Sequence, residues 1–352
     1  MGEIFGIGTS HVPYLMGAPE NMVRLRQGIC KMVERLEGRP FQDPPEALAQ
    51  LGDNPMEVGK EHHRLHWQAF TQLRAYIDEV SPDAILLIGD DQAQCFQANN
   101  LPPYALYVGA QVDAKPFYMS RFPGDAEYIR QTWGVAPDHR YLWPCQAELA
   151  VAIRDELLRN GFDIASSNDL NSDRWQYGLG HAHANTQLFL HNDDGRYPII
   201  PLFINCYGSD LNIFGTMASG QSLEAQSTSG YPPAPTSRRL YEMGRVIRNV
   251  LLRRPERVLV CPSSTWSHTW LTKKHHRMRM DVEGNLEKMH WFERGQASLL
   301  AEYDSPDIEN NGDHELRNWI VAAGIMGNRP MEVMWHVISW VSTGFRVFGI
   351  WR

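Results

Sequence analysis

The chain has few cysteines, and they form no recognisable motif. Its 352 residues include five cysteines, an odd number without a CxxC pair. A disulfide framework or a zinc site built from thiolates is therefore not expected. The sequence also lacks an apolar run of about 18 residues, the length needed to cross a bilayer, and its first residues lack the basic and apolar regions of a signal peptide. We expect a cytoplasmic protein without a membrane-spanning segment.

Positive charge is scarce as well. Lys and Arg number 33 against 41 Asp and Glu, which gives a formal net charge of -8 at pH 7. The basic cluster at residues 273–279 has the composition of a solvated loop. A surface that binds nucleic acid needs clustered Lys and Arg, so we do not expect a nucleic-acid partner.

Two common catalytic motifs are missing. The segment Gly6-Ile7-Gly8 lacks a third glycine and leads into Val12-Pro13 rather than into a helix, so it is not a dinucleotide-binding loop. The G-x-S-x-G elbow of α/β-hydrolases is also absent. These absences argue against nucleotide binding and against serine hydrolysis on that fold.

The composition is that of a folded enzyme, because 43% of the residues are hydrophobic and 21% are charged. Apolar runs predict buried strands at residues 4–7, 84–88, 104–108, 162–165, 197–204 and 258–260, the last of these being the final core strand. Helical spacing predicts helices at residues 60–80, 147–159 and 240–253. The alternation predicts an α/β fold with a single, mostly parallel central sheet, flanked by helices and carrying long insertions.

We expect one catalytic domain over residues 1–352. Residues 14–59 contain five prolines and only short helical patterns. Such a stretch is typical of an insertion that covers a site as a lid. Residues 221–237 are rich in Ser, Gly and Pro and predict a surface loop. The C-terminal part, residues 281–352, is predicted to be mostly helical.

The final stretch of the C-terminal part is rich in tryptophan, with Trp335, Trp340 and Trp351. Large apolar residues at such spacing belong more often to a core or a subunit interface than to a cofactor site. We expect them to be buried, and we expect the protein to be a homo-oligomer.

Polar residues follow the predicted strands at the points where these strands end. His11 follows the first strand, residues 90–92 follow the second, and Asn205 and His268 follow two later strands. In open α/β sheets, ligands bind at the carboxyl ends of the strands. Because the two strands of a βαβ unit end at the same edge, His11 and residues 90–92 are expected to lie side by side.

These positions supply imidazole, carboxylate and amide groups. The residues are His11, His62, His63, Asp90, Asp91, Gln92, His181, His183, Asn205, His268, Glu283 and Glu287. Two imidazoles and a carboxylate on one face suit a divalent transition metal, and open positions suit Fe(II) acting on O₂ and substrate together. Further histidines could exchange protons, because the pKa of an imidazole lies near ~6.5.

The motifs resemble those of the class III extradiol ring-cleaving dioxygenases, the superfamily of the protocatechuate 4,5-dioxygenase β subunit. They occur here in the same order: Gly8-Thr9-Ser10-His11-Val12-Pro13, Gly89-Asp90-Asp91-Gln92, Gly180-His181-Ala182, Asn205 at a strand end, Ser267-His268, Glu315-Leu316-Arg317-Asn318-Trp319-Ile320 and Ala322-Ala323-Gly324. The Gly-Asp-Asp-Gln segment is most similar to the gallate and 3-O-methylgallate dioxygenase branch. The resemblance spans nearly the whole chain.

This resemblance implies an Fe(II) enzyme that opens the ring of a catechol- or gallate-like aromatic with O₂. It implies that His11 binds iron and that His181 exchanges protons with the substrate. The glutamate ligand of the family follows the Ser-His motif near a helix start, where Glu283 fits best and Glu287 second best.

Further roles are expected for five other residues. His183 and His268 are expected to take part in proton transfer or in hydrogen bonds around the metal. Asp91, Asn205 and Tyr207 are expected to contact the substrate, although Asp91 could instead cap the following segment and Tyr207 could belong to the core.

Gln92 departs from the family pattern, because it occupies the place of the second histidine ligand. An amide oxygen is a poorer ligand for Fe(II) than an imidazole. Either Gln92 binds weakly or through water, or His62 or His63 completes the set, or the chain does not bind iron as the family does. His62 and His63 could also form a polar helix face. The alternatives are a Zn(II)-type or other metal-dependent enzyme on the same fold, and a non-catalytic subunit.

Overall fold

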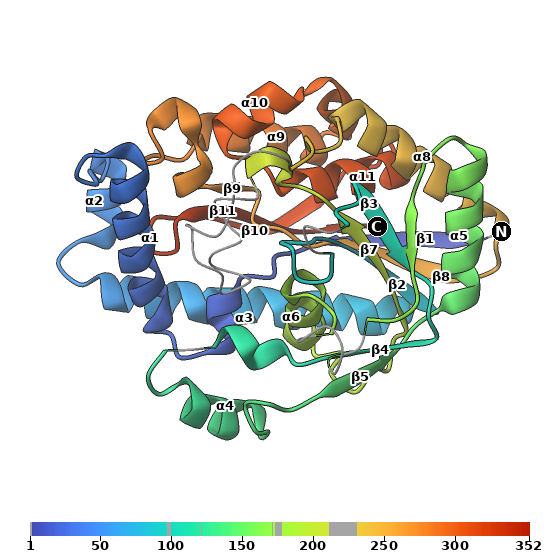
Figure 1. Ribbon diagram of the computed structural model, residues 1–352, viewed down its shortest axis with the longest axis horizontal. Helices are drawn as coiled ribbons and strands as arrows, with labels where there is room; N and C mark the ends of the chain where they lie inside the picture. The colour runs from blue at the N-terminus through green and yellow to red at the C-terminus, as the bar shows by residue number, and fades with distance from the viewer. Residues whose placement is uncertain (1, 97–99, 121, 171, 173–177, 211–230) are drawn as a thin grey trace.

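The computed structural model of the chain describes residues 2–96, 100–120, 122–170, 172, 178–210 and 231–352. A central sheet separates two layers of helices (Figure 1). The strands are β1 (Glu3–Gly8), β2 (Ala84–Asp90), β3 (Tyr104–Tyr107), β4 (Gln111–Ala114), β5 (Tyr141–Pro144), β6 (Ala165–Ser167), β7 (Ile199–Ile204), β8 (Arg257–Pro262), β9 (Ser267–His268), β10 (Glu332–Ser339) and β11 (Gly344–Trp351). The α-helices are α1 (Asn21–Glu37), α2 (Pro45–Leu51), α3 (Pro55–Val80), α4 (Asp125–Trp133), α5 (Ala147–Arg159), α6 (His181–Phe189), α8 (Ser237–Arg253), α9 (Val282–Glu293), α10 (Ser305–Asn311) and α11 (Leu316–Met326).

The sheet is mixed, so the prediction of a mostly parallel sheet was wrong, whereas the α/β class is confirmed. The strand order is β10-β11-β1-β8-β2-β7-β3-β6, and β9 pairs with β11. The centre, from β1 through β8 and β2 to β7, is parallel. In contrast, β11 runs antiparallel to β1, and β3 runs antiparallel to β7. A short turn joins β10 to β11, and such a connection permits only antiparallel pairing.

The central strands are apolar along their whole length because both of their faces are covered. In β2, Leu86 and Ile88 belong to the core on the side of α5, α8 and α11. Ile85 and Leu87 belong to the core on the side of α3 and α6. This alternation follows from the two-residue period of a strand, and burial of both faces explains the continuous apolar run.

The last part of the chain departs from the predicted helical structure. Helices α9, α10 and α11 occupy its first half, but β10 and β11 form the end and add an edge to the sheet. Strand β8 is therefore not the last core strand. Trp340 and Trp351 are buried as expected, and Trp335 packs against His66, with ring centroids 4.9 Å apart.

Most predicted helices are confirmed, with shifted ends. Helix α5 matches the predicted bounds, whereas α3 begins five residues early, at Pro55, because proline is well tolerated in the first turn. The stretch predicted as an insertion contains α1 and α2. The loop predicted at residues 221–237 lies outside the described residues up to position 230, and α8 begins at Ser237.

Helices α8 and α11 approach each other unusually closely. A Cβ atom on Gly324 would lie 2.1 Å from the backbone oxygen of Tyr241, and one on Gly244 would lie 2.2 Å from that of Val321. Only glycine permits this approach, since real Cβ atoms do not tolerate such distances. The contact fixes α11, whose first turn follows Glu315.

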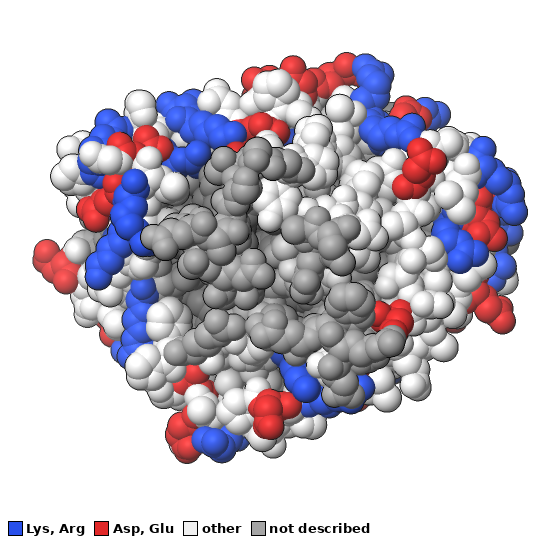
Figure 2. All heavy atoms as spheres, viewed as in Figure 1, with Lys and Arg blue, Asp and Glu red and all other residues white. Residues whose placement is uncertain are grey.

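The surface carries charges of both signs. On the face shown in Figure 2, the described Lys, Arg, Asp and Glu side chains are interspersed around the rim, without a continuous basic area among them. No helix in the described ranges is long and apolar enough to cross a bilayer. All five cysteines are free thiols.

Candidate functional site

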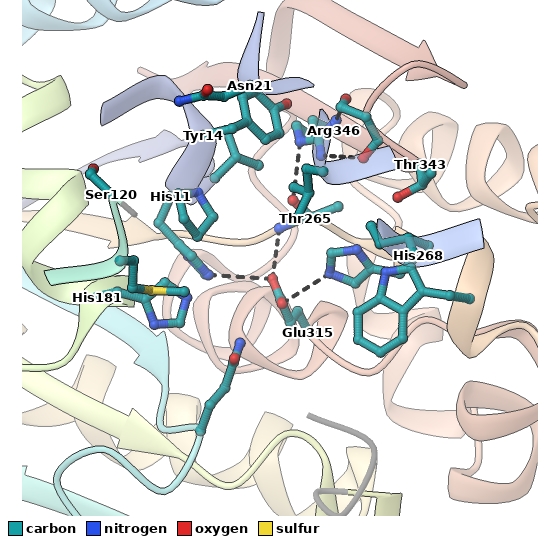
Figure 3. Close-up of a pocket in the computed structure, with 18 of the residues that line it drawn as sticks. His11, Tyr14, Asn21, Ser120, His181, Thr265, His268, Glu315, Thr343 and Arg346 are labelled. Carbon is teal, nitrogen blue, oxygen red and sulfur yellow. Dashed lines mark hydrogen bonds and ion pairs between the residues drawn. The ribbon is translucent and has the colours of Figure 1, made fainter. Parts of the chain in front are cut away.

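A cavity of about 290 Å³ opens at the carboxyl ends of the central strands (Figure 3). The residues that line it are His11, Val12, Pro13, Tyr14, Asn21, Leu25, Ile29, Gln92, Met119, Ser120, Phe122, Asp125, His181, Thr265, His268, Trp270, Glu315, Ser342, Thr343 and Arg346. Three of them, Asn21, Leu25 and Ile29, come from α1, within the stretch predicted to cover a site.

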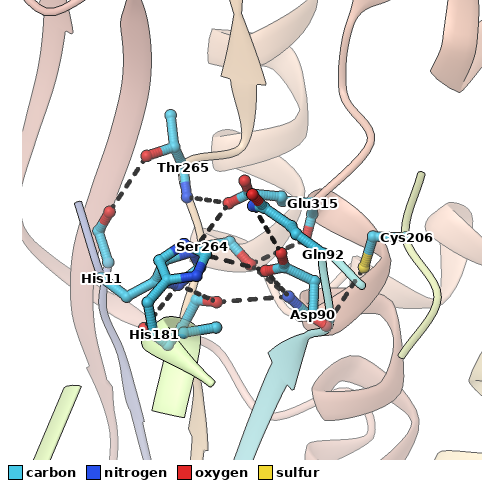
Figure 4. Close-up of polar contacts among 12 residues, drawn as sticks. His11, Asp90, Gln92, His181, Cys206, Ser264, Thr265 and Glu315 are labelled. Carbon is cyan, nitrogen blue, oxygen red and sulfur yellow. Dashed lines mark hydrogen bonds and ion pairs between the residues drawn. The ribbon is translucent and has the colours of Figure 1, made fainter. Parts of the chain in front are cut away.

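At one end of the cavity, His11, Asp90 and Glu315 bring their ligand atoms within 4.8 Å of one another. We call these three residues the metal cluster. His11 follows β1, Asp90 ends β2, and Glu315 directly precedes α11. His11 Nε2 lies 3.5 Å from Asp90 Oδ1 and 3.6 Å from Glu315 Oε2 (Figure 4). All three side chains are buried.

The strands that carry His11 and Asp90 are not neighbours, contrary to the simplest reading of a βαβ unit. Strand β8 lies between β1 and β2 and pairs with both. The two side chains nevertheless meet because they reach across the end of β8. The expected proximity of His11 to the end of the second predicted strand is confirmed.

The His11 ring presents a lone pair to the two carboxylates. Its Nδ1 atom lies 3.0 Å from the carbonyl oxygen of Ser263. A carbonyl only accepts hydrogen bonds, so Nδ1 carries the hydrogen and Nε2 is an acceptor. Burial lowers the pKa of His11, which keeps the ring neutral. Three acceptors thus face one another, an arrangement that is favourable only with a cation or a proton between them.

The two carboxylates differ in their tendency to ionise. Burial, reinforced by the nearby Glu315 charge, raises the pKa of Asp90 well above its ordinary value. Burial acts in the same direction on Glu315, but the charge of His11 in its protonated form and hydrogen bonds from His268 and Tyr207 outweigh it and lower the pKa of Glu315. Of the two carboxylates, Asp90 is therefore the more readily protonated.

Glu315 is fixed by donors on three sides. Its Oε2 atom accepts from the backbone N–H of Thr265 at 2.8 Å, and its Oε1 atom lies 3.1 Å from His268 Nε2. The Tyr207 hydroxyl donates to the same carboxylate. Tyr207 is buried and does not line the cavity, so the structure gives it a contact with Glu315 rather than the expected contact with substrate.

Gln92 orients Asp90. Its Nε2 atom donates to Asp90 Oδ2 at 3.0 Å and to the Tyr207 hydroxyl oxygen at 3.2 Å. Asn318 Nδ2 adds a longer contact of 3.4 Å to Asp90 Oδ1. The structure therefore places Gln92 as a hydrogen-bond donor to Asp90, and Asp90 rather than Gln92 lies beside His11.

His181 faces the cavity from the first turn of α6. Its Nδ1 atom lies 2.8 Å from Gln94 Oε1, which also accepts from the His181 backbone N–H at 3.0 Å. An amide oxygen only accepts, so Nδ1 carries the hydrogen and Nε2 is the free base. Burial, with a smaller contribution from His11, lowers the pKa of His181 well below its ordinary value. The rings of His181 and His11 lie edge to face, with centroids 5.1 Å apart.

The predicted carboxylate ligands on α9 lie away from the metal cluster. Glu283 is exposed and pairs with Arg279 at 3.1 Å, and Glu287 is exposed as well. Asn285 and Met289 occupy the buried side of the same helix. Residues four apart share a helix face, so Glu283 and Glu287 both point outward. The structure brings Glu315, rather than either of these two residues, beside His11.

The two histidines of α3 that were considered as replacements for Gln92 do not line the cavity. His62 Nδ1 lies 2.9 Å from Ser339 Oγ. His63 is buried, with its ring beside Trp67. Burial lowers the pKa of each to about 4. Neither side chain is exposed, so the structure places both in the packing around α3 rather than on an exposed polar face.

Three further predicted residues lie outside the cavity lining. His183 Nε2 contacts the carbonyl oxygen of Leu202 at 3.0 Å beneath the sheet. The Asp91 carboxylate accepts from the backbone N–H groups of Cys95 and Phe96, both at 2.9 Å, so it caps the following turn. Asn205 Oδ1 accepts from the backbone N–H of Gly208 at 2.9 Å, which also closes a turn. The structure therefore gives these three side chains contacts with the backbone, away from the cavity.

The sequence named Asp90 only as one of several candidates and gave no function to Glu315 or Gln94. Glu315 begins the segment Glu315-Leu316-Arg317-Asn318-Trp319-Ile320, which was matched to the extradiol family without a role for the glutamate. Asp90 stands at a predicted strand end, and this position alone indicates that its side chain could face a ligand site. Gln94 carried no signal, because its contact with His181 spans 87 residues.

No family model matches the chain. The chain is similar to two proteins named 2,3-dihydroxyphenylpropionate/2,3-dihydroxicinnamic acid 1,2-dioxygenase. One, from Photorhabdus laumondii, is 26% identical over 215 residues, which cover 61% of this chain and 51% of that protein. The other, from Comamonas testosteroni, is 28% identical over 156 residues, which cover 44% of this chain and 40% of that protein. The chain thus spans about half the length of the first relative and less than half the length of the second. The names of both relatives support the resemblance to extradiol ring-cleaving dioxygenases, without distinguishing a branch within them.

Proposed function

We propose that the chain is a single-domain, Fe(II)-dependent extradiol dioxygenase that opens the ring of a catechol- or gallate-like aromatic with O₂. The observation that carries the proposal is the convergence of His11 Nε2, Asp90 and Glu315 at the end of the cavity. The names of the two relatives agree with this reaction class.

The residues present fit a divalent transition metal. One imidazole and two carboxylates offer nitrogen and oxygen donors of the type that Fe(II) accepts, and His11 donates its other ring N–H to a backbone carbonyl, as metal-bound histidines usually do. We assign the metal to His11, Asp90 and Glu315. When bound, Fe(II) would supply the Lewis acid and redox centre at which the dihydroxyl group and O₂ are activated.

In the reaction, His181 acts as the proton acceptor and donor. Its Nε2 atom is unprotonated and its ring faces the cavity beside His11. Gln94 holds the ring in this tautomer, so a hydroxyl of the bound ring can pass its proton to Nε2 and receive it again after ring opening. Proton transfer by a positioned side chain contributes typically about 10²- to 10⁴-fold in rate.

His268 and the backbone of Thr265 serve the site indirectly. Both hold the Glu315 carboxylate, at 3.1 and 2.8 Å. His268 lies at the wall of the cavity, so its ring also limits where a substrate can sit. Apolar side chains such as Leu25, Phe122 and Trp270 complete the walls and suit a flat aromatic ring.

The decisive experiment combines metal analysis with O₂ consumption. The protein should be purified without oxygen, loaded in parallel with Fe(II), Mn(II) or Zn(II), and assayed with catechol, 3,4-dihydroxybenzoate and gallate. We expect about one metal per chain and O₂ uptake with Fe(II), with ¹⁸O from ¹⁸O₂ in both new oxygen positions of the product.

Other outcomes would identify the alternatives. Tight binding of Zn(II), with no O₂ uptake under any metal, would favour a metal-dependent enzyme of another reaction on the same fold. Absence of stoichiometric metal under all three conditions would favour a non-catalytic subunit.

A further inference from the structure

Arg346 is a buried cation in the wall of the cavity. It lies on β11, is 1% exposed, and is the only Lys or Arg among the described residues that line the cavity. Its hydrogen bonds go to neutral partners: Nε donates to Thr265 Oγ1 at 3.1 Å, Nη1 to Ser342 Oγ at 2.9 Å and to the Gly344 carbonyl at 3.4 Å, and Nη2 to the Ser342 carbonyl at 3.3 Å.

The guanidinium group keeps unused capacity for an anion. An arginine has five N–H donors, and these contacts use Nε once, Nη1 twice and Nη2 once, which leaves one N–H on Nη2. Within the described part of the chain, no carboxylate lies at ion-pair distance from Arg346, and the Glu315 charge acts on it only from beyond that distance. A buried charge without a directly paired counter-charge is costly, so the site favours an anionic ligand that would supply one.

Thr343 lies beside Arg346 in the cavity wall, and its hydroxyl group also has unused hydrogen-bonding capacity. Its side chain is 3% exposed, and its Oγ1 atom has no hydrogen-bond partner among the described residues. Its backbone is left-handed, with φ at +53°, which a β-branched residue rarely adopts. The strained turn between β10 and β11 thus holds a hydroxyl where glycine would fit more easily, a pattern found mainly at ligand sites.

This pair lies close to the metal cluster and is connected to it through Thr265. The Thr265 hydroxyl accepts from Arg346 Nε, while the Thr265 backbone N–H donates to Glu315 Oε2 at 2.8 Å (Figure 3). The cavity therefore has two binding features. One is the metal cluster, whose acceptors suit a cation, and the other is the fixed positive charge of Arg346, with Thr265 between them. A small ring with an anionic substituent and a dihydroxyl edge can meet both.

We propose that Arg346, assisted by the Thr343 hydroxyl, binds a carboxylate on the aromatic ring and so selects ring acids over neutral catechols. This inference rests on the proposed function for the identity of the ring. The planar fork of arginine matches a carboxylate in shape and charge. The Tyr14 ring, with its centroid 5.6 Å from the Arg346 guanidinium carbon, supports the group from one side.

The test compares 3,4-dihydroxybenzoate with its methyl ester, which keeps the ring and the diol but removes the charge. Anaerobic calorimetric titration with the Fe(II)-loaded protein should show tighter binding of the acid. Because hydrogen bonds to charged groups are strong, Arg346→Gln should weaken binding of the acid roughly 10- to 100-fold and leave the ester nearly unchanged. Arg346→Lys should restore part of the preference, and Thr343→Val should weaken binding of the acid by a smaller factor.

Arg317→Gln is the matched control. Arg317 is another fully buried arginine, but it donates to the carbonyl oxygens of Cys206 and Pro235 and does not line the cavity. Its loss should lower the melting temperature without changing the ratio of acid to ester affinity. Should Arg346→Gln fail to fold, Arg346→Lys and Thr343→Val still report that ratio.

Equal affinity of the unaltered protein for acid and ester, or an equal loss of both in the Arg346 variants, would overturn the proposal. The proposed reaction can fail separately. If the acid binds with dependence on Arg346 but no ring opens with Fe(II) and O₂, the subsite stands and the dioxygenase assignment does not.

Discussion

Gln92 donates its side-chain amide to Asp90 Oδ2 across 3.0 Å, so the residue expected to bind metal instead orients a neighbour that can. This relationship predicts a ranking. Asp90→Asn removes a ligand charge and should abolish stoichiometric binding of Fe(II). Gln92→Leu removes only the supporting donor and should weaken metal binding by about 10- to 100-fold, the usual effect of a partner behind a ligand.

Metal titrations of the two variants decide this ranking. Asp91→Asn is the control, because Asp91 is buried next to Asp90 but caps a turn through backbone N–H groups. Tighter metal binding by the Asp90 variant than by the Gln92 variant would return the ligand role to the glutamine amide.

The choice of glutamate gives a second prediction. Glu315→Gln should eliminate stoichiometric metal, since Glu315 is buried within 3.6 Å of His11. Glu283→Gln should keep full metal content and shift the free energy of unfolding by no more than about 0.5 kcal/mol, as expected for a surface residue. Metal analysis after dialysis and chemical denaturation measure the two effects. Loss of metal in the Glu283 variant alone would contradict the assignment.

Protonation of Asp90 gives a third prediction. Burial and the Glu315 charge raise the pKa of Asp90 well above its ordinary value, so the carboxyl group holds its proton until a cation displaces it. Metal binding must then release a proton, and affinity should rise with pH up to the folded-state pKa. Calorimetry with Mn(II) in buffers of different ionisation enthalpy counts the released protons, and an enthalpy that does not depend on the buffer would contradict the prediction.

The same shift has a consequence for stability. A carboxyl group whose pKa is raised on folding stabilises the metal-free protein below its unfolded pKa, near ~3.9, and this contribution is lost as pH rises through the folded pKa. The stabilisation of the fold by metal should therefore increase over the same range. The melting temperatures of metal-loaded and metal-free protein measure this effect. If their difference did not change with pH, the predicted increase in stabilisation by metal would be contradicted.

The sequence was sufficient for the parts of the molecule that depend on local pattern. The run at residues 84–88 is apolar because both faces of β2 are covered, and it therefore identified a central strand. His11 and His181, which both line the cavity, stand close to a boundary that the sequence shows, a strand end in one case and a glycine before a helix in the other. These signals are contained within a few residues.

The errors concern contacts between distant segments. The glutamate beside His11 is Glu315, 304 positions away by subtraction of the residue numbers, whereas the family resemblance pointed to the glutamates of α9. Strand β11 was missed because an edge hairpin that packs beside β1 shows no feature that sets it apart from a short buried helix. No local pattern marks Arg346 either, because only the folded sheet brings it to the cavity.

The last prediction separates proton transfer from metal binding. His181→Phe removes Nε2 without touching His11, Asp90 or Glu315, so it should retain its metal while turnover falls by roughly 10²- to 10⁴-fold. Gln94→Leu should have a smaller effect of a different kind. Gln94 accepts from both the ring and the backbone of His181, at 2.8 and 3.0 Å, and its loss frees the ring to adopt the other tautomer. The expected sign is a lower kcat with a displaced pH profile, with KM nearly unchanged. Metal content and anaerobic binding of catechol, measured alongside, show whether the site is still intact. If His181→Phe loses its metal together with its activity, the ring is a ligand rather than a base, and the metal would be held by two histidines after all.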